Sequence, residues 1–222
     1  MLVEFEAVIL PAVRRPGRPV GANSDQTRRT ILCAARDVIA EHGYRAATFQ
    51  LIARRAGVSR PTLHYYFATR EQLYEVLLAD VRAEVARCAA EATLAGSLLR
   101  QLEVFIAEMH RLGGAEPALM GLVVTARVDH RGVLRHDAAA AVVATVHAFF
   151  DAVVVDAVRR GELAFDADAH AVADLLGALF WGLVFHAGFI SGAGGAPEIA
   201  RQLLRMVGFG LLDTPEPASV GA

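Results

Sequence analysis

Residues 48–73 read TFQLIARRAGVSRPTLHYYFATREQL, and this stretch decides how we expect the chain to fold. Thr48 and Ser59 are good N-cap residues, because a hydroxyl oxygen accepts a hydrogen bond from a free amide in the first helical turn. Gly57 suits the left-handed conformation in which many helices end. The stretch therefore predicts one short helix over 49–56 and a second one from Ser59 through Phe67, joined by a tight turn.

Longer helices are expected on both sides of this pair. Upstream, from Arg28 to a stop at Gly43, apolar residues recur at the spacing of an amphipathic helix: Ile31, Ala34, Ala35, Val38 and Ile39. Downstream, Thr69 and Gln72 fit a capping box at the start of a long helix that runs past Val85.

The rest of the chain also predicts helices. Apolar residues make up 55% of the sequence, and no segment alternates as a half-buried strand would. Weak glycine breaks divide the chain beyond Gly96 into helices at roughly 97–112, 117–128, 134–160, 168–190 and 197–212. The expected fold class is all-α.

Charge is distributed unevenly along the chain. Between Arg14 and Arg87 there are 13 Arg against 7 acidic residues, an excess of +6. From Cys88 onward there are 9 Arg against 15 acidic residues, an excess of −6. The basic half is where an anionic polymer would bind.

Several other classes of protein are disfavoured. Cys33 and Cys88 have no partner at disulfide or zinc spacing, which fits a reducing cytoplasm. The N-terminal segment carries Glu4 and Glu6 where a signal peptide needs positive charge. The histidines are scattered, and no nucleotide-binding or hydrolase motif occurs, so we expect no metal, no cofactor and no enzymatic activity.

Two short helices joined by a glycine-containing turn form the helix-turn-helix that reads the major groove of DNA. The order and spacing of the surrounding residues closely resemble the N-terminal domain of the TetR (tetracycline repressor) family over about residues 24–78. The resemblance rests on Arg28-Arg29-Thr30-Ile31-Leu32, Glu41-His42-Gly43-Tyr44, Ile52-Ala53, Ala56-Gly57-Val58-Ser59, Leu63, Tyr65, Phe67 and Thr69-Arg70-Glu71-Gln72-Leu73.

The resemblance implies a homodimeric regulator that binds double-stranded DNA at a palindromic operator, most simply a repressor released by a small, mostly apolar effector. It implies a leader and basic arm at 1–23, a helix-turn-helix domain at 24–78, a helical ligand-binding and dimerisation domain at 79–214, and a tail at 215–222. The chain departs from the family in the order His64-Tyr65-Tyr66-Phe67, where His and Tyr have exchanged places. A looser likeness to one TetR subgroup begins at Arg160-Gly161-Glu162-Leu163.

Candidate DNA-binding residues follow from their chemistry. Arg60, Thr62 and His64 are the expected base readers, because they are polar residues on the first turns of the reading helix. Phosphate contacts are expected from hydroxyls, exposed amides and cations at Arg28, Thr48, Ser59, Tyr65, Tyr66, Thr69 and Arg70. Arg14, Arg15 and Arg18 form a basic arm suited to a narrow minor groove.

Alternative interpretations of these residues stay open. Tyr65 or Tyr66 can instead pack between the third and fourth helices, and the arm can be a solvated tail. Leu63 and Phe67 are expected in the core.

The segment from Leu175 to Ile190 is the most apolar in the chain. With 16 residues free of Asp, Glu and Arg it is too short for the roughly 20 that a bilayer requires. We therefore expect no membrane span and instead a subunit interface built by the last two helices, as in the family that the chain resembles.

An effector pocket is expected among the middle helices. The candidate residues are Phe105, Met109, Met120, Val124, Arg127, His147, Phe150, Trp181, Phe185, His186 and Phe189. Each of them can equally be plain core, since apolar residues at helical spacing need no ligand to explain them. A DNA-binding regulator controlled by a protein partner, or without any effector, is the alternative function.

Overall fold

The computed structural model describes residues 20–115, 136–163, 168–189 and 196–210. The described segments are helical apart from short turns, and the element order has eight helices and no strand among these residues. The helices are α1 (Val20–Ala46), α2 (Phe49–Ala56), α3 (Arg60–Tyr66), α4 (Arg70–Thr93), α5 (Leu98–Ala115), α7 (His136–Arg159), α8 (Ala169–Phe189) and α9 (Ala196–Gly210). The all-α prediction is confirmed.

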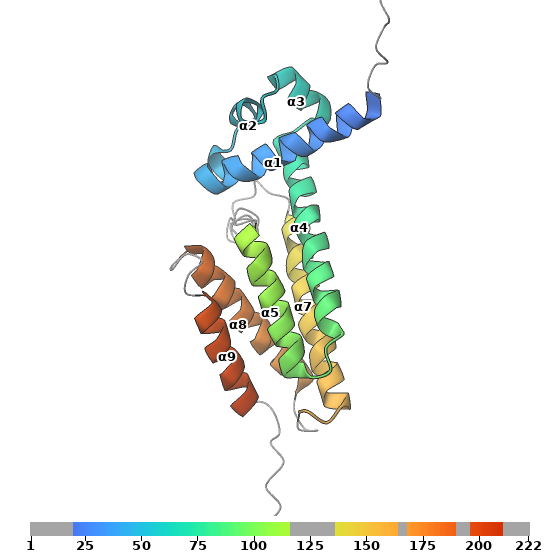
Figure 1. The fold of residues 1–222 in the computed structure, drawn as a ribbon, viewed down its shortest axis with the longest axis vertical. Coiled ribbons are helices and arrows are strands. Elements are labelled where there is room, and N and C mark those ends of the chain that lie inside the picture. The colour runs from blue at the N-terminus through green and yellow to red at the C-terminus, as the bar shows by residue number, and fades with distance from the viewer. Residues whose placement is uncertain (1–19, 116–135, 164–167, 190–195, 211–222) are drawn as a thin grey trace, which may run out of the picture.

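Helices α1, α2 and α3 form a small head at one end of the molecule (Figure 1). α1 begins at Val20, eight residues before the amphipathic pattern that predicted it. Gly43 breaks the helical geometry of α1 with φ +74° and ψ 164°, which agrees with the expected stop. Helices α5 and α7 pack on α4, and α8 and α9 pack on these two to complete a bundle (Figure 1).

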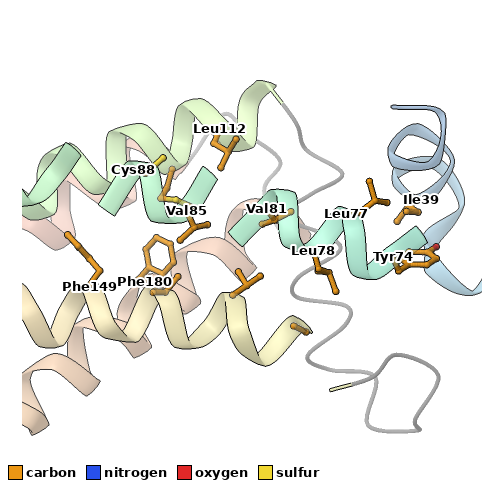
Figure 2. Packing of buried hydrophobic residues seen from close by; sticks show 14 of the residues in the cluster. Ile39, Tyr74, Leu77, Leu78, Val81, Val85, Cys88, Leu112, Phe149 and Phe180 are labelled. Atoms are coloured by element: carbon orange, nitrogen blue, oxygen red, sulfur yellow. The ribbon is translucent and has the colours of Figure 1, made fainter. Parts of the chain in front are cut away.

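Helix α4 connects the head to the bundle. Its 24 residues make it about 36 Å long, since a helix rises about 1.5 Å per residue. Figure 2 shows its buried face running from Tyr74 beside Ile39 of α1 to Cys88 beside Leu112 of α5. One helix therefore contributes to the packing of both parts.

The bundle core centres on aromatic side chains from three helices. Phe105 of α5 stacks on Phe149 of α7 with ring centroids 4.1 Å apart, and it contacts Phe180 of α8 at 5.3 Å. All three rings are at most 5% exposed. Buried aromatic contacts of this kind hold α5, α7 and α8 in a fixed arrangement.

A polar junction ties three helix ends together at the far end of α4. Among the described residues, Gln101 is the fully buried polar side chain, and its Nε2 donates to the carbonyl of Thr93 at 3.2 Å. Arg160 donates to Gln101 Oε1 at 3.3 Å and to Glu162. The Glu162 carboxylate accepts from the backbone amide of Leu98 at 2.6 Å, so it caps α5 from a distant part of the chain.

Two helices are long and apolar enough to cross a membrane by length and composition alone, Ala138–Arg159 of α7 and Ala169–Ala187 of α8. The uncharged segment that starts at Leu175 is part of the longer helix α8, which begins at Ala169 and includes Asp174. Their inner faces pack against each other and, for α7, against α4. These contacts make them core helices of the bundle.

Most helix boundaries agree with the sequence analysis within a few residues. The segments expected at 97–112, 134–160, 168–190 and 197–212 correspond to α5, α7, α8 and α9. The helix expected at 117–128 lies outside the described residues.

Phe105→Ala should lower the free energy of unfolding by about 3–5 kcal/mol, because it removes the ring at the centre of the aromatic cluster and leaves a cavity. Leu94→Ala is the control, since Leu94 is 87% exposed and its loss should cost less than about 0.5 kcal/mol. Urea unfolding followed by circular dichroism, at equal protein concentrations, measures both. Equal effects of the two substitutions would contradict the assignment of this core.

Candidate DNA-binding interface

The turn between α2 and α3 has the geometry that its sequence predicts. Thr48 Oγ accepts from the Leu51 amide at 3.3 Å, which caps α2. Gly57 has φ +66°, and the amides of Gly57 and Val58 bond back to Arg54 and Ala53 in a Schellman motif. The predicted caps of this pair are confirmed, and they fix the angle between the two helices.

Helix α3 begins at a second cap. Ser59 Oγ accepts from the Thr62 amide at 3.1 Å and lies 2.7 Å from the Thr62 hydroxyl. Leu63 and Phe67 are at most 1% exposed, as expected, and anchor the helix on the head. The predicted start and the predicted core residues of α3 are therefore confirmed.

The outer face of α3 carries the residues expected to read DNA. Arg60, His64 and Tyr65 are exposed, and Tyr65 is 82% exposed. Their spacing along α3 places them on one side of the helix. Thr62 and Tyr66 are half-buried, and the Tyr65 and Tyr66 rings meet edge to face at 5.2 Å. The accessible side of α3 thus presents a cation, an imidazole and a phenol.

Three candidate residues also have structural contacts within the head. Arg28 lies over the Phe67 ring at 5.4 Å, and the His64 ring meets Phe49 edge-on at 4.9 Å. Arg70 stacks on Tyr44 at 4.9 Å and donates to the carbonyl of Arg45 at 3.3 Å. Arg70 therefore holds the end of α1 against α4, beside any role in phosphate binding.

The cap of α4 differs slightly from the predicted capping box. Thr69 Oγ accepts from the Gln72 amide at 3.1 Å, as expected. The Gln72 side chain accepts from the amide of Ala68 at 2.7 Å, which is one residue before the N-cap. The α4 start is fixed by both bonds.

An ion-pair clamp fixes α2 on α1, and sequence reasoning missed it. Arg55 binds Glu41 through two hydrogen bonds of 2.8 and 2.5 Å, and Asp37 lies 3.8 Å away. These two hydrogen bonds lower the pKa of Glu41 and raise the pKa of Arg55. No sequence spacing links positions 41 and 55, because the pair forms only when α2 folds back onto α1.

Arg14, Arg15 and Arg18 of the expected basic arm lie outside the described residues. The same holds for Met120, Val124 and Arg127 among the effector candidates, and nothing is described for the side chain of Phe189.

The bundle contains an apolar cleft between α5, α7, α8 and α9. Its volume is about 30 Å³, and it is lined by Leu102, Ile106, Phe150, Leu176, Leu179, Phe180, Leu183, Leu203, Leu204 and Val207. Among the effector candidates whose side chains the structure describes, Phe150 is the one that lines it. Phe105 and Met109 are buried in the core, whereas Phe185 is 45% exposed. Trp181 contacts the cleft residue Phe180 with ring centroids 5.5 Å apart.

Sequence reasoning favoured large aromatic side chains and overlooked the leucines that form this cleft. Leucines at helical spacing are typical of any core, so only the meeting of four helices distinguishes these.

The histidines are less scattered than the sequence analysis assumed. His147 and Asp151 are four residues apart on α7, as are His170 and Asp174 on α8. The structure brings the His147 and His170 nitrogens within 3.9 Å and 3.7 Å of the Asp174 carboxylate. Even so, no three His, Cys, Asp or Glu side chains in the described part of the chain are placed to hold a metal ion.

Residues 31–77 match the sequence profile of the family described as "Bacterial regulatory proteins, tetR family". Residues 31–77 therefore form a tetR-family domain. Its fold is similar to that of the TetR family protein CprB from S. coelicolor A3(2), with a TM-score of 0.68 and 26% identity over 85% of this chain and 91% of that one. The curated relatives that the chain matches are named as transcriptional regulators, which agrees with the expectation that the chain is not an enzyme.

Two curated relatives match the head of this chain. It is 40% identical over 68 residues to the HTH-type transcriptional activator FasR of Mycolicibacterium smegmatis, covering 28% of this chain and 31% of that protein. It is 35% identical over 75 residues to the HTH-type transcriptional repressor AcnR of Corynebacterium diphtheriae, covering 33% of this chain and 40% of that protein. The matched segment thus spans less than half of either relative, and one activates where the other represses.

Tyr65→Phe should weaken DNA binding without changing stability, because the exposed hydroxyl has a phosphate as its expected partner. A hydrogen bond to a charged group contributes about 1.5–3 kcal/mol. Tyr74→Phe is the matched control: Tyr74 is buried, burial raises the pKa of its phenol, and its hydroxyl lies 3.4 Å from the Tyr44 carbonyl. Fluorescence anisotropy with operator DNA measures the DNA affinity, and thermal unfolding measures the stability. If Tyr65→Phe lowered stability and left DNA affinity unchanged, Tyr65 would be a packing residue.

Proposed function

We propose that this chain is a cytoplasmic transcriptional regulator that binds a palindromic operator as a homodimer and releases it when an apolar effector binds. The observation that carries the proposal is the exposed face of α3, where Arg60, His64 and Tyr65 stand on a capped helix that its buried residues anchor on the head. Exposed polar side chains on a short, rigidly held helix are what major-groove reading requires. The basic excess of the same half supplies attraction to phosphates.

Dimerisation is supported by an apolar seam on α8. Ala171, Leu175, Ala178, Gly182 and Phe185 are all exposed and follow one another at intervals of four and three residues. This is the spacing of a helix that packs along a second helix. Alanine and glycine at the middle of the seam allow two such helices to approach closely. A second copy of the chain is therefore the proposed partner of this face.

The outer face of α9 is less suited to the interface than the sequence analysis supposed. Its exposed residues include Glu198, Arg201, Gln202 and Arg205, with Met206 as the large apolar exception. Glu198 forms an ion pair with Arg201. We therefore centre the proposed two-fold interface on α8.

The proposed effector site is the apolar cleft, and its position suggests how release works. Leu176, Leu179, Phe180 and Leu183 of α8 line the cleft, while the seam occupies the opposite side of the same helix. No residue of α4 lines the cleft. A molecule that fills the cleft therefore acts first on α8 and on the dimer geometry, which sets the distance between the two reading helices.

A regulator controlled by a protein partner is the second candidate. It is favoured by the small cleft, because 30 Å³ is far below the roughly 300–1,000 Å³ of typical ligand pockets. An effector must therefore widen the cleft to bind.

Leu175→Arg should convert the dimer to a monomer, because it places a charge in the centre of the proposed seam. The monomer should lose affinity for a palindromic operator, since a dimer meets two half-sites about 34–36 Å apart at once. Leu94→Arg is the control, because Leu94 is exposed in the loop after α4 and away from α8. Analytical ultracentrifugation and operator titration at several salt concentrations provide the readouts. A Leu175→Arg protein that stays dimeric and binds the palindrome normally would refute this interface.

The effector and the operator should weaken each other's binding by the same factor, on the order of 5–150-fold, since coupling between two sites is reciprocal. Trp181 is the single tryptophan and contacts Phe180 of the cleft, so its fluorescence should report occupancy. Apolar compounds are titrated with and without operator DNA. Equal affinities in both titrations would exclude release by that compound, and operator release only by a protein partner would favour the second candidate.

A further inference from the structure

The ten side chains that line the cleft in the described part of the chain are all aliphatic or phenylalanine. None of them offers a hydrogen-bond donor or acceptor. A polar ligand atom placed among them would lose its water without gaining a partner, which is unfavourable. The part of a ligand that enters this cleft must therefore be hydrocarbon.

Of the polar effector candidates, His147 and His186 do not line the cleft, and Arg127 lies outside the described residues. A ring nitrogen of His147 lies 3.9 Å from the Asp174 carboxylate. The same ring lies so close to Gly177 that a Cβ on that residue would be 3.3 Å from it. A ligand in the cleft is therefore held by shape and by burial of its apolar surface.

The cleft is also narrow. A volume of about 30 Å³ is small, since a cavity needs roughly 10–15 Å³ to hold a single water molecule. Six of the lining residues are leucines: Leu102, Leu176, Leu179, Leu183, Leu203 and Leu204. Leucine has no branch at Cβ and changes rotamer more readily than valine or isoleucine. A chain one methylene wide can enter by leucine rotation, whereas a fused-ring molecule requires whole helices to separate.

One side of the cleft reaches solvent. Ile106, Leu179, Leu183, Leu203 and Leu204 are half-buried, while Leu102, Phe150 and Leu176 are at most 5% exposed. A ligand with a polar head can thus insert its tail toward the buried residues and keep its head in water.

We propose that the cleft binds the unbranched alkyl chain of an amphiphile and leaves the polar head group in solvent. The proposal rests on the effector cleft of the proposed function and adds the chemical class of the ligand. It requires selection by chain length and shape, with little selection by head-group charge.

Binding is measured on the full-length protein without DNA, by isothermal titration calorimetry and Trp181 fluorescence. The probes are octanoate, decanoate and dodecanoate below their micelle concentrations, the alkyltrimethylammonium ion of matching chain length, and the fused-ring carboxylate cholate. Each added methylene should raise affinity about fourfold, because burial of one methylene contributes about that factor. The carboxylate and the ammonium compound of equal chain length should bind alike, and cholate more weakly than dodecanoate.

Leu204→Trp should abolish dodecanoate binding, because the indole fills the cleft. Leu94→Trp introduces the same ring at an exposed site and should leave binding unchanged, and Leu179→Phe serves as a second blocking variant if Leu204→Trp does not fold by circular dichroism. No saturable binding by any alkyl chain, selection by head-group charge, tighter binding of cholate, or full binding by folded blocking variants would each overturn the proposal.

The proposed function can fail separately. Saturable alkyl binding that leaves operator affinity unchanged would refute effector release and keep this inference. Release of the operator by a compound that is not an alkyl amphiphile, without any alkyl binding, would refute this inference and keep effector release.

Discussion

Helix α4 contributes one continuous buried face to two separate parts of the molecule. Leu73, Tyr74 and Leu77 pack at the head end, and Val85 and Cys88 pack at the bundle end. A straight helix transmits the position of one end to the other, because its backbone hydrogen bonds resist bending. The orientation of α3 relative to the bundle therefore depends on how the two ends of α4 are held.

The two ends are held by different chemistry. At the head, Arg36 pairs with Asp80 at 3.0 Å, and Arg70 stacks on Tyr44. At the other end, Gln101 binds the carbonyl of Thr93 within a buried junction. A buried polar side chain is costly unless it is paired, so Gln101 fixes the helix ends specifically as well as firmly. The junction holds the C-terminal end of α4 in place. We therefore expect movement of the helices that line the cleft to reach the reading helices through α8 and the proposed dimer, more directly than through this end of α4.

The two faces of α8 place the proposed effector cleft and the proposed dimer seam on one helix. Leu176 and Leu183 face the cleft, whereas Leu175 and Phe185 are exposed on the seam. A densely packed helix cannot shift on one side without disturbing the other, because protein interiors have little free volume. In the proposed function, an apolar ligand that widens the cleft therefore changes the relation between the two subunits without a polar trigger.

The sequence by itself determined the helical head, because its signals are local: Thr48, Gly57 and Ser59 specify helix ends within a few residues of themselves. It also determined that α3 exposes Arg60 and His64 while Leu63 is buried, since this follows from helical periodicity. The Arg55–Glu41 clamp, the Gln101 junction and the leucine cleft were decided only by the tertiary structure. Each joins residues from helices that are brought together by folding, and a leucine or an arginine on one helix has the same sequence pattern whether its partner is solvent, core or a ligand.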